Sequence, residues 1–297
     1  VDFFRGFYED PYTFGIIAAN HSLSDCHAMG CDAVSALAIA VLPFGLEHKT
    51  EDALFQMMAG ACKALKDSNC ALVGGHTCEG KEMALGFSIN GTIERGTGGS
   101  NGFGLQKGGL EPGHALVLTK PIGTGVIFAA RMRNKCKGRH VTTALASMCT
   151  SNRVAAQLAL KHKARACTDV TGFGLLGHLV EMCKASGVVG QLNLGDVPFL
   201  PGATDCVEQG IFSSLQPQNI RLVRAVVREA STELKGARYN LLFDPQTAGG
   251  LLVSIPKRAA KAYVKDLHDA GYTEAAVVGE VQKGTRGKGP ECIKIIS

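Results

Sequence analysis

TDVTGFGLLGH, residues 168–178, joins an apolar segment to a helical pattern through a glycine-rich turn. Asp169 ends the apolar segment, and after the turn leucines and Met182 recur at helical spacing. The pattern predicts a strand–loop–helix junction with a carboxylate at the mouth of the loop. Such junctions bind phosphate groups, because glycine amides and the amides at a helix N-terminus attract anions.

A carboxylate at this position indicates a metal ion as well as a phosphate. Asp169 cannot bind phosphate directly, so a divalent cation between the two groups is the natural inference. The alternative is structural: Asp169 and Thr171 cap the helix, and the glycines only turn the chain. This segment alone leaves both interpretations open.

The composition indicates a globular protein that neither spans a membrane nor binds nucleic acid. The 297 residues suffice for two domains, and 45% are hydrophobic and 19% charged. A net charge of +5 is small, and no Lys/Arg run has the density of a nucleic-acid-binding arm. No apolar stretch is long enough for a transmembrane helix. Eleven scattered cysteines without a C-x-x-C pair favour reduced thiols in the cytoplasm.

Helical and strand patterns alternate along the chain and predict an α/β or α+β fold. Thr50 is the expected N-cap of the second helix, and the glycine-rich residues 96–113 are the best candidate for a domain boundary. We expect helices at 13–29, 53–65, 142–162, 221–234 and 257–270, and strands at 1–4, 33–42, 71–73, 83–93, 115–119, 191–194, 239–243, 251–255, 276–281 and 292–296.

Three aspartates lie where a metal site would need them: Asp2 on the opening strand, Asp25 at the polar end of a helix, and Asp169 before the turn. Carboxylates that converge repel one another unless cations neutralise them, and Mg²⁺ with a polyphosphate is the usual occupant. Each aspartate taken separately could equally be a cap or a surface charge.

A second candidate for phosphate binding is Gly74-Gly75-His76-Thr77, which follows a three-residue apolar strand. Glycine lets the backbone approach a phosphate and donate its amide hydrogens. Most glycine pairs are only turns, however. The chain has neither a P-loop nor a dinucleotide-binding fingerprint.

Taken together, these segments resemble the selenophosphate synthetase (selenide, water dikinase) family of the aminoimidazole-ribotide-synthetase-like superfamily. TDVTGFGLLGH and DPQTAGG, residues 244–250, are its most specific motifs. The matching segments occur in the family order and cover nearly the whole chain: 1–4, 10–15, 23–25, 28–30, 74–77, 118–125, 168–178 and 244–252.

The resemblance implies a two-domain PurM-like (AIR synthase-like) fold. Residues 1–112 would form an α/β domain that binds ATP and pairs with its copy in a homodimer, and residues 113–297 an α+β domain. The family makes selenophosphate, AMP and orthophosphate from ATP, selenide and water, and so supplies selenium for selenocysteine synthesis. The resemblance implies Mg²⁺ as cofactor, leaves K⁺ open, and implies a cytoplasmic enzyme with only small-molecule substrates.

Site residues follow from the same resemblance. Asp2 and Asp25 would lie at the ATP phosphates with their metals, and Asp169 would be a metal ligand from the second domain. Gly74, Gly75, His76 and Thr77 would contact ATP, with a route across the dimer interface left open. The physical task is phosphoryl transfer by positioning and charge neutralisation.

One departure from the family concerns the catalytic residues. In the family a glycine-rich N-terminal segment carries a catalytic Cys or selenocysteine, an essential Lys and a further metal-binding Asp. This chain opens at Val1, on an apolar strand downstream of all three. We therefore expect a truncated chain whose catalytic Cys or selenocysteine and Lys lie upstream of Val1, with no catalytic residue of this set and a defect in the full reaction.

Three alternatives stay open. One is another ATP-dependent enzyme of the superfamily, such as a thiamine-monophosphate kinase or a hydrogenase-maturation protein. A second is a non-catalytic nucleotide-binding paralogue. The third is an unrelated α/β binding protein, which would have to match all these motifs by chance.

Overall fold

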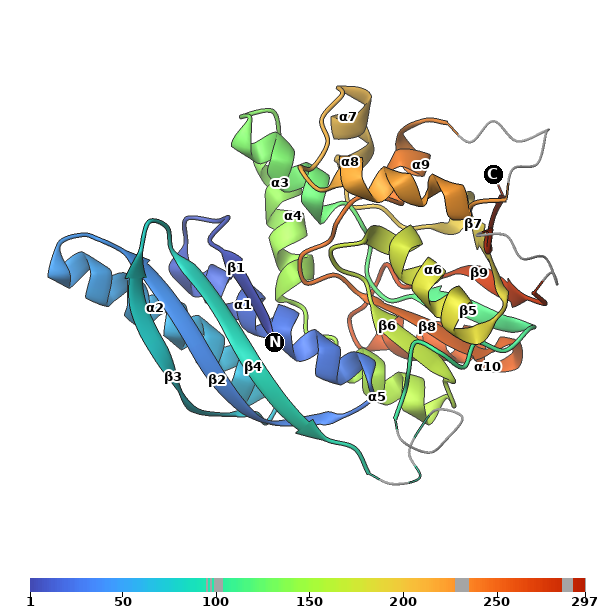
Figure 1. Ribbon diagram of the computed structural model, residues 1–297, viewed down its shortest axis with the longest axis horizontal. Helices are drawn as coiled ribbons and strands as arrows, with labels where there is room; N and C mark the ends of the chain where they lie inside the picture. Colours follow the sequence, from blue (N-terminus) through green and yellow to red (C-terminus); the bar gives the residue numbers. More distant parts are fainter. Residues whose placement is uncertain (95, 97, 99–103, 228–234, 285–290, 297) are drawn as a thin grey trace.

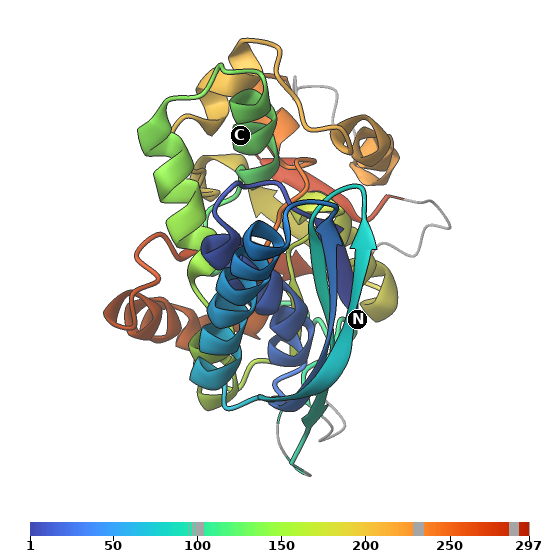
Figure 2. The same cartoon turned by 90° about the vertical axis from the view of Figure 1, so that its left-hand side faces the viewer.

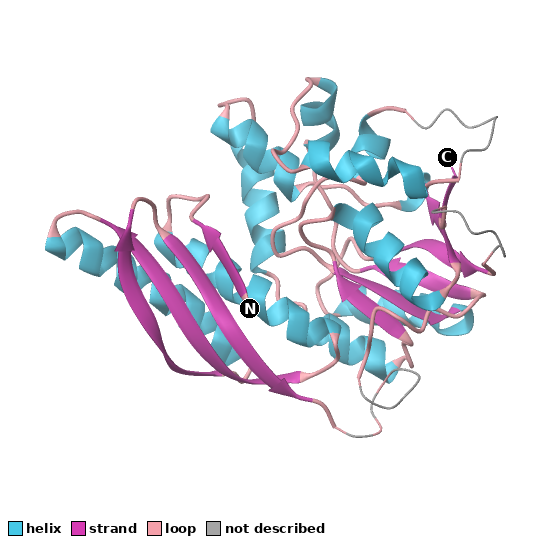
Figure 3. Cartoon of the chain, in the orientation of Figure 1, coloured by secondary structure: helices cyan, strands magenta, loops and turns pink. Residues whose placement is uncertain are grey.

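The computed structural model describes residues 1–94, 96, 98, 104–227, 235–284 and 291–296, and these form two β-sheets with helices packed on them (Figures 1 and 3). The first sheet comes from the first third of the chain, which contains β1 (Asp2–Arg5), α1 (Pro11–Ala28), β2 (Asp32–Pro43), α2 (Glu47–Asp67), β3 (Ala71–Gly80) and β4 (Ala84–Thr92).

The second sheet has six strands in the order β10-β7-β9-β5-β8-β6. The remaining elements of the described residues are β5 (His114–Leu118), α3 (Thr124–Met132), α4 (Gly138–Cys149), α5 (Arg153–Lys161), β6 (Ala166–Asp169), α6 (Gly174–Ser186), β7 (Val189–Asn193), η1 (Leu194–Asp196), α7 (Ala203–Glu208), α8 (Gln216–Asn219), η2 (Ile220–Ala225), α9 (Ala237–Leu241), β8 (Leu251–Pro256), α10 (Lys257–Asp269), β9 (Ala276–Gln282) and β10 (Ile293–Ile296).

The first sheet has the order β1-β4-β2-β3, with β3 parallel to β2 at one edge. Figure 2 shows α1 and α2 against one face of it. On β2 the residues toward these helices are mostly alanines, whereas the outward face carries Val34, Leu37 and Ile39, each more than two-fifths exposed. Such a patch of large aliphatic side chains on the outward face is typical of a surface that another layer covers.

Helix α1 lies between this sheet and the second half of the chain. Asp10 caps it, since one of its carboxylate oxygens accepts a hydrogen bond from the Tyr12 amide at 3.1 Å. Phe14 packs into the core of the first sheet, Ile17 into a core built by the second half, and the Asn20 amide donates to the Cys149 carbonyl at 2.8 Å. A helix that is buried on nearly all sides fixes the two halves relative to each other.

The opening strand is confirmed with a later start than expected. The sequence pattern predicts a strand from Val1, whereas β1 begins at Asp2 and Val1 lies outside it. The reason is the pairing with β4, whose register starts where Asp2 lies opposite Phe87. Val1 has no partner in this ladder and is exposed.

Most other predicted elements are confirmed, and the exceptions have physical reasons. Helix α2 begins at Glu47, not after Thr50, whose hydroxyl instead donates to the Leu46 carbonyl inside the first turn. The apolar run at 239–243 reads as a strand and is helix α9, because five apolar residues do not separate a buried strand from a buried helix.

Three further expectations need correction. The single helix expected at 142–162 is two helices, α4 and α5, that break at residues 150–152, and α3 before them has no counterpart in the sequence pattern. The helix expected at 221–234 begins as the 3₁₀ helix η2, and its residues 228–234 lie outside the described part of the chain. Finally, β3 runs through residues 74–77, which the glycine pair predicts as a loop.

None of the described helices is long and apolar enough to cross a membrane.

Helices α1 and α2 cross where two glycines face the opposing backbone. A Cβ on Gly60 would lie 2.0 Å from the Tyr12 carbonyl oxygen, and one on Gly15 would lie 1.9 Å from that of Met57. We therefore expect Gly60→Ala to push the helices apart and to lower the free energy of unfolding by about 1–3 kcal/mol, measured by urea denaturation. Gly138→Ala is the matched control: its Cβ would meet no atom within 4 Å, so it should be neutral or slightly stabilising. Equal stabilities for both variants would contradict the close crossing.

Candidate active site

Strand β1 and helix α1 bring two of the predicted aspartates together. Asp2 and Phe4 face α1, while Phe3 between them faces outward. His21 and Asp25 are four residues apart on α1 and share one of its faces. The Asp2 carboxylate lies 3.8 Å from Nε2 of His21 and within hydrogen-bond reach of the Asp25 carboxyl.

The third aspartate reaches the same place from the second half of the chain. Asp169 ends β6, is buried, and accepts a hydrogen bond from the Ser24 hydroxyl on α1. Burial, with the nearby Asp25 charge second, raises the pKa of Asp169 to about 6. Burial followed by Asp25 raises the pKa of Asp2 to about 7. The three carboxyls therefore form one repelling cluster.

The cluster fits a hard cation that keeps part of its coordination for other oxygens. Among the described residues, no three His, Cys, Asp or Glu side chains form a ready-made metal-binding group. Carboxylate oxygens are the donors that Mg²⁺ prefers, and Mg²⁺ commonly takes only one or two of them beside water and phosphate oxygens. Carboxyls with raised pKa values also indicate a site at which a positive charge would relieve repulsion.

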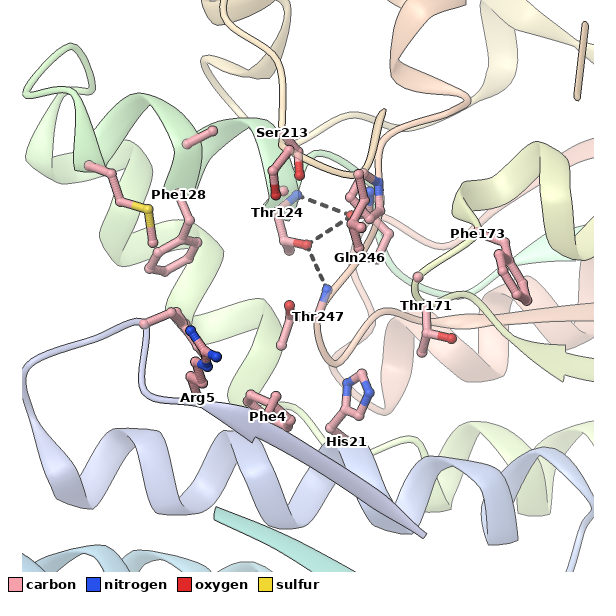
Figure 4. Close-up of a pocket in the computed structure, with 18 of the residues that line it drawn as sticks. Phe4, Arg5, His21, Thr124, Phe128, Thr171, Phe173, Ser213, Gln246 and Thr247 are labelled. Atoms are coloured by element: carbon pink, nitrogen blue, oxygen red, sulfur yellow. Dashed lines mark hydrogen bonds between the residues drawn. The ribbon is translucent and has the colours of Figure 1, made fainter. Parts of the chain in front are cut away.

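A cleft of about 670 Å³ opens beside the cluster (Figure 4). Asp2 and His21 line it from one side, and residues of α3 and of segments 171–173, 212–215 and 245–247 line it from the other. Arg5 and Arg133 add positive charge to the wall, although Arg5 also pairs with Glu82 at 3.4 Å. Apart from Asp2, the sequence pattern predicts none of these side chains as a binding residue.

The DPQTAGG segment builds one wall of this cleft by capping α3. The side-chain oxygen of Gln246 accepts hydrogen bonds from the amides of Gly123 and Thr124 at 2.8 and 3.0 Å. The Asp244 carboxylate accepts from the Val126 amide at 3.2 Å. These side chains satisfy amides that an α-helix leaves unpaired at its N-terminus. The motif is therefore structural at Asp244 and Gln246, while Thr247 faces the cleft.

The turn after Asp169 differs from both sequence interpretations. Phe173, without a side-chain cap, occupies the N-cap of α6, so Asp169 and Thr171 do not cap this helix. The Thr171 amide donates to Nε2 of His178 at 3.1 Å, and the Leu176 amide donates to the Leu242 carbonyl at 3.0 Å. These two amides are thus already paired within the protein.

Gly74, Gly75, His76 and Thr77 lie apart from the three aspartates. They belong to the exposed edge strand β3 and line a separate surface cavity of about 510 Å³. Their expected turn is an extended strand, and within one subunit they do not meet the aspartate cleft. Backbone pairing explains the error: residues 74–77 continue the parallel ladder with β2, which a glycine pair disguises in the sequence.

Comparisons with known proteins place this geometry in a family. Residues 1–93 match the N-terminal domain and residues 111–290 the C-terminal domain of the AIR synthase related proteins. The selenide, water dikinase of Clostridioides difficile is 36% identical over 95% of this chain and 78% of its own length. That of Geobacter metallireducens is 37% identical over 94% of this chain and 78% of its own.

This chain belongs to the selenide, water dikinase family. Solved structures agree on the fold. A hydrogenase maturation protein HypE in complex with ATP has a TM-score of 0.69 at 18% identity, covering 91% of this chain and 71% of its own. A ThiL protein complexed with AMPPCP and TMP has a TM-score of 0.68 at 17% identity, covering 99% and 81%. The predicted two-domain PurM-like fold is thereby confirmed.

The aspartate cluster makes a prediction about stability. Because the folded-state pKa of Asp169 is raised, its contribution to stability is full below the unfolded pKa of about 3.9 and is lost as the pH rises through about 6. In metal-free buffer at pH 8, Asp169→Asn should therefore raise the free energy of unfolding by about 1–3 kcal/mol, and near pH 4 the two proteins should agree. Thermal melts at both pH values measure this. A variant less stable than the parent at pH 8 would show that Asp169 does not lie in a repelling cluster.

Proposed function

We propose that this protein is a selenide, water dikinase that converts ATP, selenide and water to selenophosphate, AMP and orthophosphate. The observation that carries the proposal is the convergence of Asp2, Asp25 and Asp169, from both halves of the chain, beside one cleft. Membership of the dikinase family supplies the substrate class. The likeness to HypE and ThiL structures supports the fold alone.

In this proposal Asp2, Asp25 and Asp169 hold Mg²⁺ and the ATP phosphates between the two halves. Bound Mg²⁺ would neutralise the charge on the transferring phosphoryl group. The protein supplies positioning: Asp169 is fixed by Ser24, and Thr124 donates its hydroxyl to Gln246 while it accepts the Thr247 amide at 3.0 Å. Arginines on the cleft wall attract the polyphosphate.

We further propose a homodimer in which the first sheet of each copy covers the other. Three features support it: the exposed aliphatic face of β2, the unpaired edge of β3, and the separation of residues 74–77 from the aspartates of the same subunit. His76 pairs in register with Ile39 and shares its outward face. A partner seated there would meet Gly74, Gly75, His76 and Thr77, so these residues would contact ATP from across the interface.

The proposed domain division is at residues 112 and 113, between β4 and β5. We also propose a cytoplasmic location, supported by eleven cysteines that are all free thiols in a structure that contains several close cysteine pairs.

The catalytic Cys or selenocysteine and Lys of the family remain a proposal that rests on the sequence resemblance, which puts them upstream of Val1. The site residues proposed here, Asp2, Asp25 and Asp169, bind and position, and none of them replaces that pair. A test of the reaction therefore uses the full-length product of the gene.

Product analysis tests the reaction. The full-length protein, incubated without oxygen with ATP, Mg²⁺ and selenide, with and without K⁺, should give AMP and selenophosphate by phosphorus NMR. Asp169→Ala should lower the rate at least roughly a hundredfold, because removal of a charge-positioning group costs that order. Thiamine monophosphate in place of selenide should give no ADP. ADP as the nucleotide product, or turnover independent of selenide, would assign the protein to another branch of the superfamily.

The dimer proposal predicts a mass of twice 31.2 kDa in sedimentation equilibrium. Ile39→Asp should give monomers, because it puts a charge in the centre of the covered face. Phe55→Asp on α2 is the matched control, since Phe55 is also an exposed large apolar residue but points away from that sheet face. A monomeric parent protein, or an Ile39→Asp dimer, would remove the proposed interface.

A further inference from the structure

Ala248, within the DPQTAGG segment, has a backbone conformation that alanine rarely adopts. Its φ is +47°, in the left-handed region where a side chain is strained. Three groups hold it there. Its amide donates to Nδ1 of His21 at 2.9 Å, and its carbonyl accepts from Nζ of Lys120 at 2.8 Å. The buried Lys120 also donates to the carbonyls of Ser147 and Thr150, which anchors the segment to the end of α4.

The bond from Ala248 fixes the tautomer of His21. Since Nδ1 accepts a hydrogen bond, the ring proton must be on Nε2 in the neutral imidazole. Nε2 is the atom that faces the Asp2 carboxylate at 3.8 Å. Phe4 holds the ring plane with an edge contact at a centroid separation of 5.2 Å. His21 therefore presents an N–H to Asp2 in an orientation set by residue 248.

A second arm runs from the next residue to Asp169. The Gly249 carbonyl accepts from the buried Asn152 side chain at 2.8 Å, and the same Asn152 nitrogen lies 2.9 Å from the Ser24 hydroxyl oxygen. Ser24 in turn donates to Asp169. Gly249 cannot be replaced without movement, because a Cβ there would lie 2.1 Å from the Val170 carbonyl oxygen.

We propose that residues 248–249 are a positioning hub that sets the separation of Asp2 and Asp169, with His21 and Asn152 as its two positioning residues. This inference rests on the proposed function, since it takes the aspartates as ligands of a cation bound with a nucleotide. Its physical basis is general: side chains that hydrogen-bond to metal ligands fix their orientation, and loss of such a side chain typically weakens metal binding by roughly 10–100-fold. Neither His21 nor Asn152 needs to touch the cation.

The variants His21→Asn and Asn152→Ala separate the two arms. Asparagine at 21 keeps an acceptor near the position of Nδ1 for the Ala248 amide, but it is too short to reach Asp2. Each has a matched control outside the hub. His162→Asn also removes a histidine that faces an aspartate, here Asp266 at 2.8 Å, and Asn240→Ala removes an asparagine whose amide donates to the Gly236 carbonyl.

The first readout is the affinity for Mn²⁺ in the presence of a non-hydrolysable ATP analogue, by electron paramagnetic resonance. Both hub variants should bind Mn²⁺ roughly 10–100-fold more weakly, the two controls should bind as the parent does, and all should keep their melting temperature within a few degrees. Parent-like Mn²⁺ affinity in both hub variants would overturn the hub. A parent protein that binds no Mn²⁺ with nucleotide would instead overturn the proposed function.

The second readout needs no metal or nucleotide. Nitrogen-15 NMR of histidine-labelled protein should show His21 as the Nε2-protonated tautomer, with its signal identified by its loss in His21→Asn. Asn152→Ala should shift that signal, because it releases residue 249 beside the residue that His21 holds. The Nδ1-protonated tautomer, or a signal unmoved by Asn152→Ala, would overturn the hub whether or not the protein binds nucleotide.

Discussion

The constraint on which the rest of the structure depends is the burial of α1 on nearly all sides. The first sheet and α2 cover one side of the helix, and α4, α5 and β6 approach it from the other half of the chain. A helix so enclosed has few places for charged groups. His21, Ser24 and Asp25 therefore lie where the two halves leave a cleft. The interface between the halves and the candidate site are thus one feature, and a displacement of α1 would alter both.

Burial also explains why the carboxyls are strained at rest. Asp169 is buried and Asp2 half-buried, so each loses hydration while it faces another negative group. The fold tolerates this because the surrounding backbone is tied down elsewhere: Asp244 and Gln246 cap α3, and Lys120 gathers three carbonyls. A bound cation would turn the mutual repulsion into attraction, which is how a rigid site favours a charged ligand.

The sequence predicts what local pattern encodes and misses what distant contacts create. Asp2, Asp25 and Asp169 stand out because each ends or begins a strongly patterned element. His21 reads only as a packing position on its helix, since its partner Ala248 lies 227 residues away. Gln246 reads only as part of a motif, because its role appears when α3 is placed beside it. The apolar run at 239–243 fails for another reason: Tyr239 and Leu241 are both buried, so helix and strand periods give the same pattern.

Residues 74–77 show a limit of a different kind. A glycine pair after a short apolar run suggests a turn, yet here it continues an edge strand whose outward face holds His76 next to Ile39. The deciding signal is on β2, where alanines face the helices and larger aliphatic residues face outward, the reverse of an ordinary half-buried strand. A sheet with its larger apolar side chains outside requires a second layer. A motif on that sheet can then serve a site that its own subunit does not complete, which no pattern within one chain reveals.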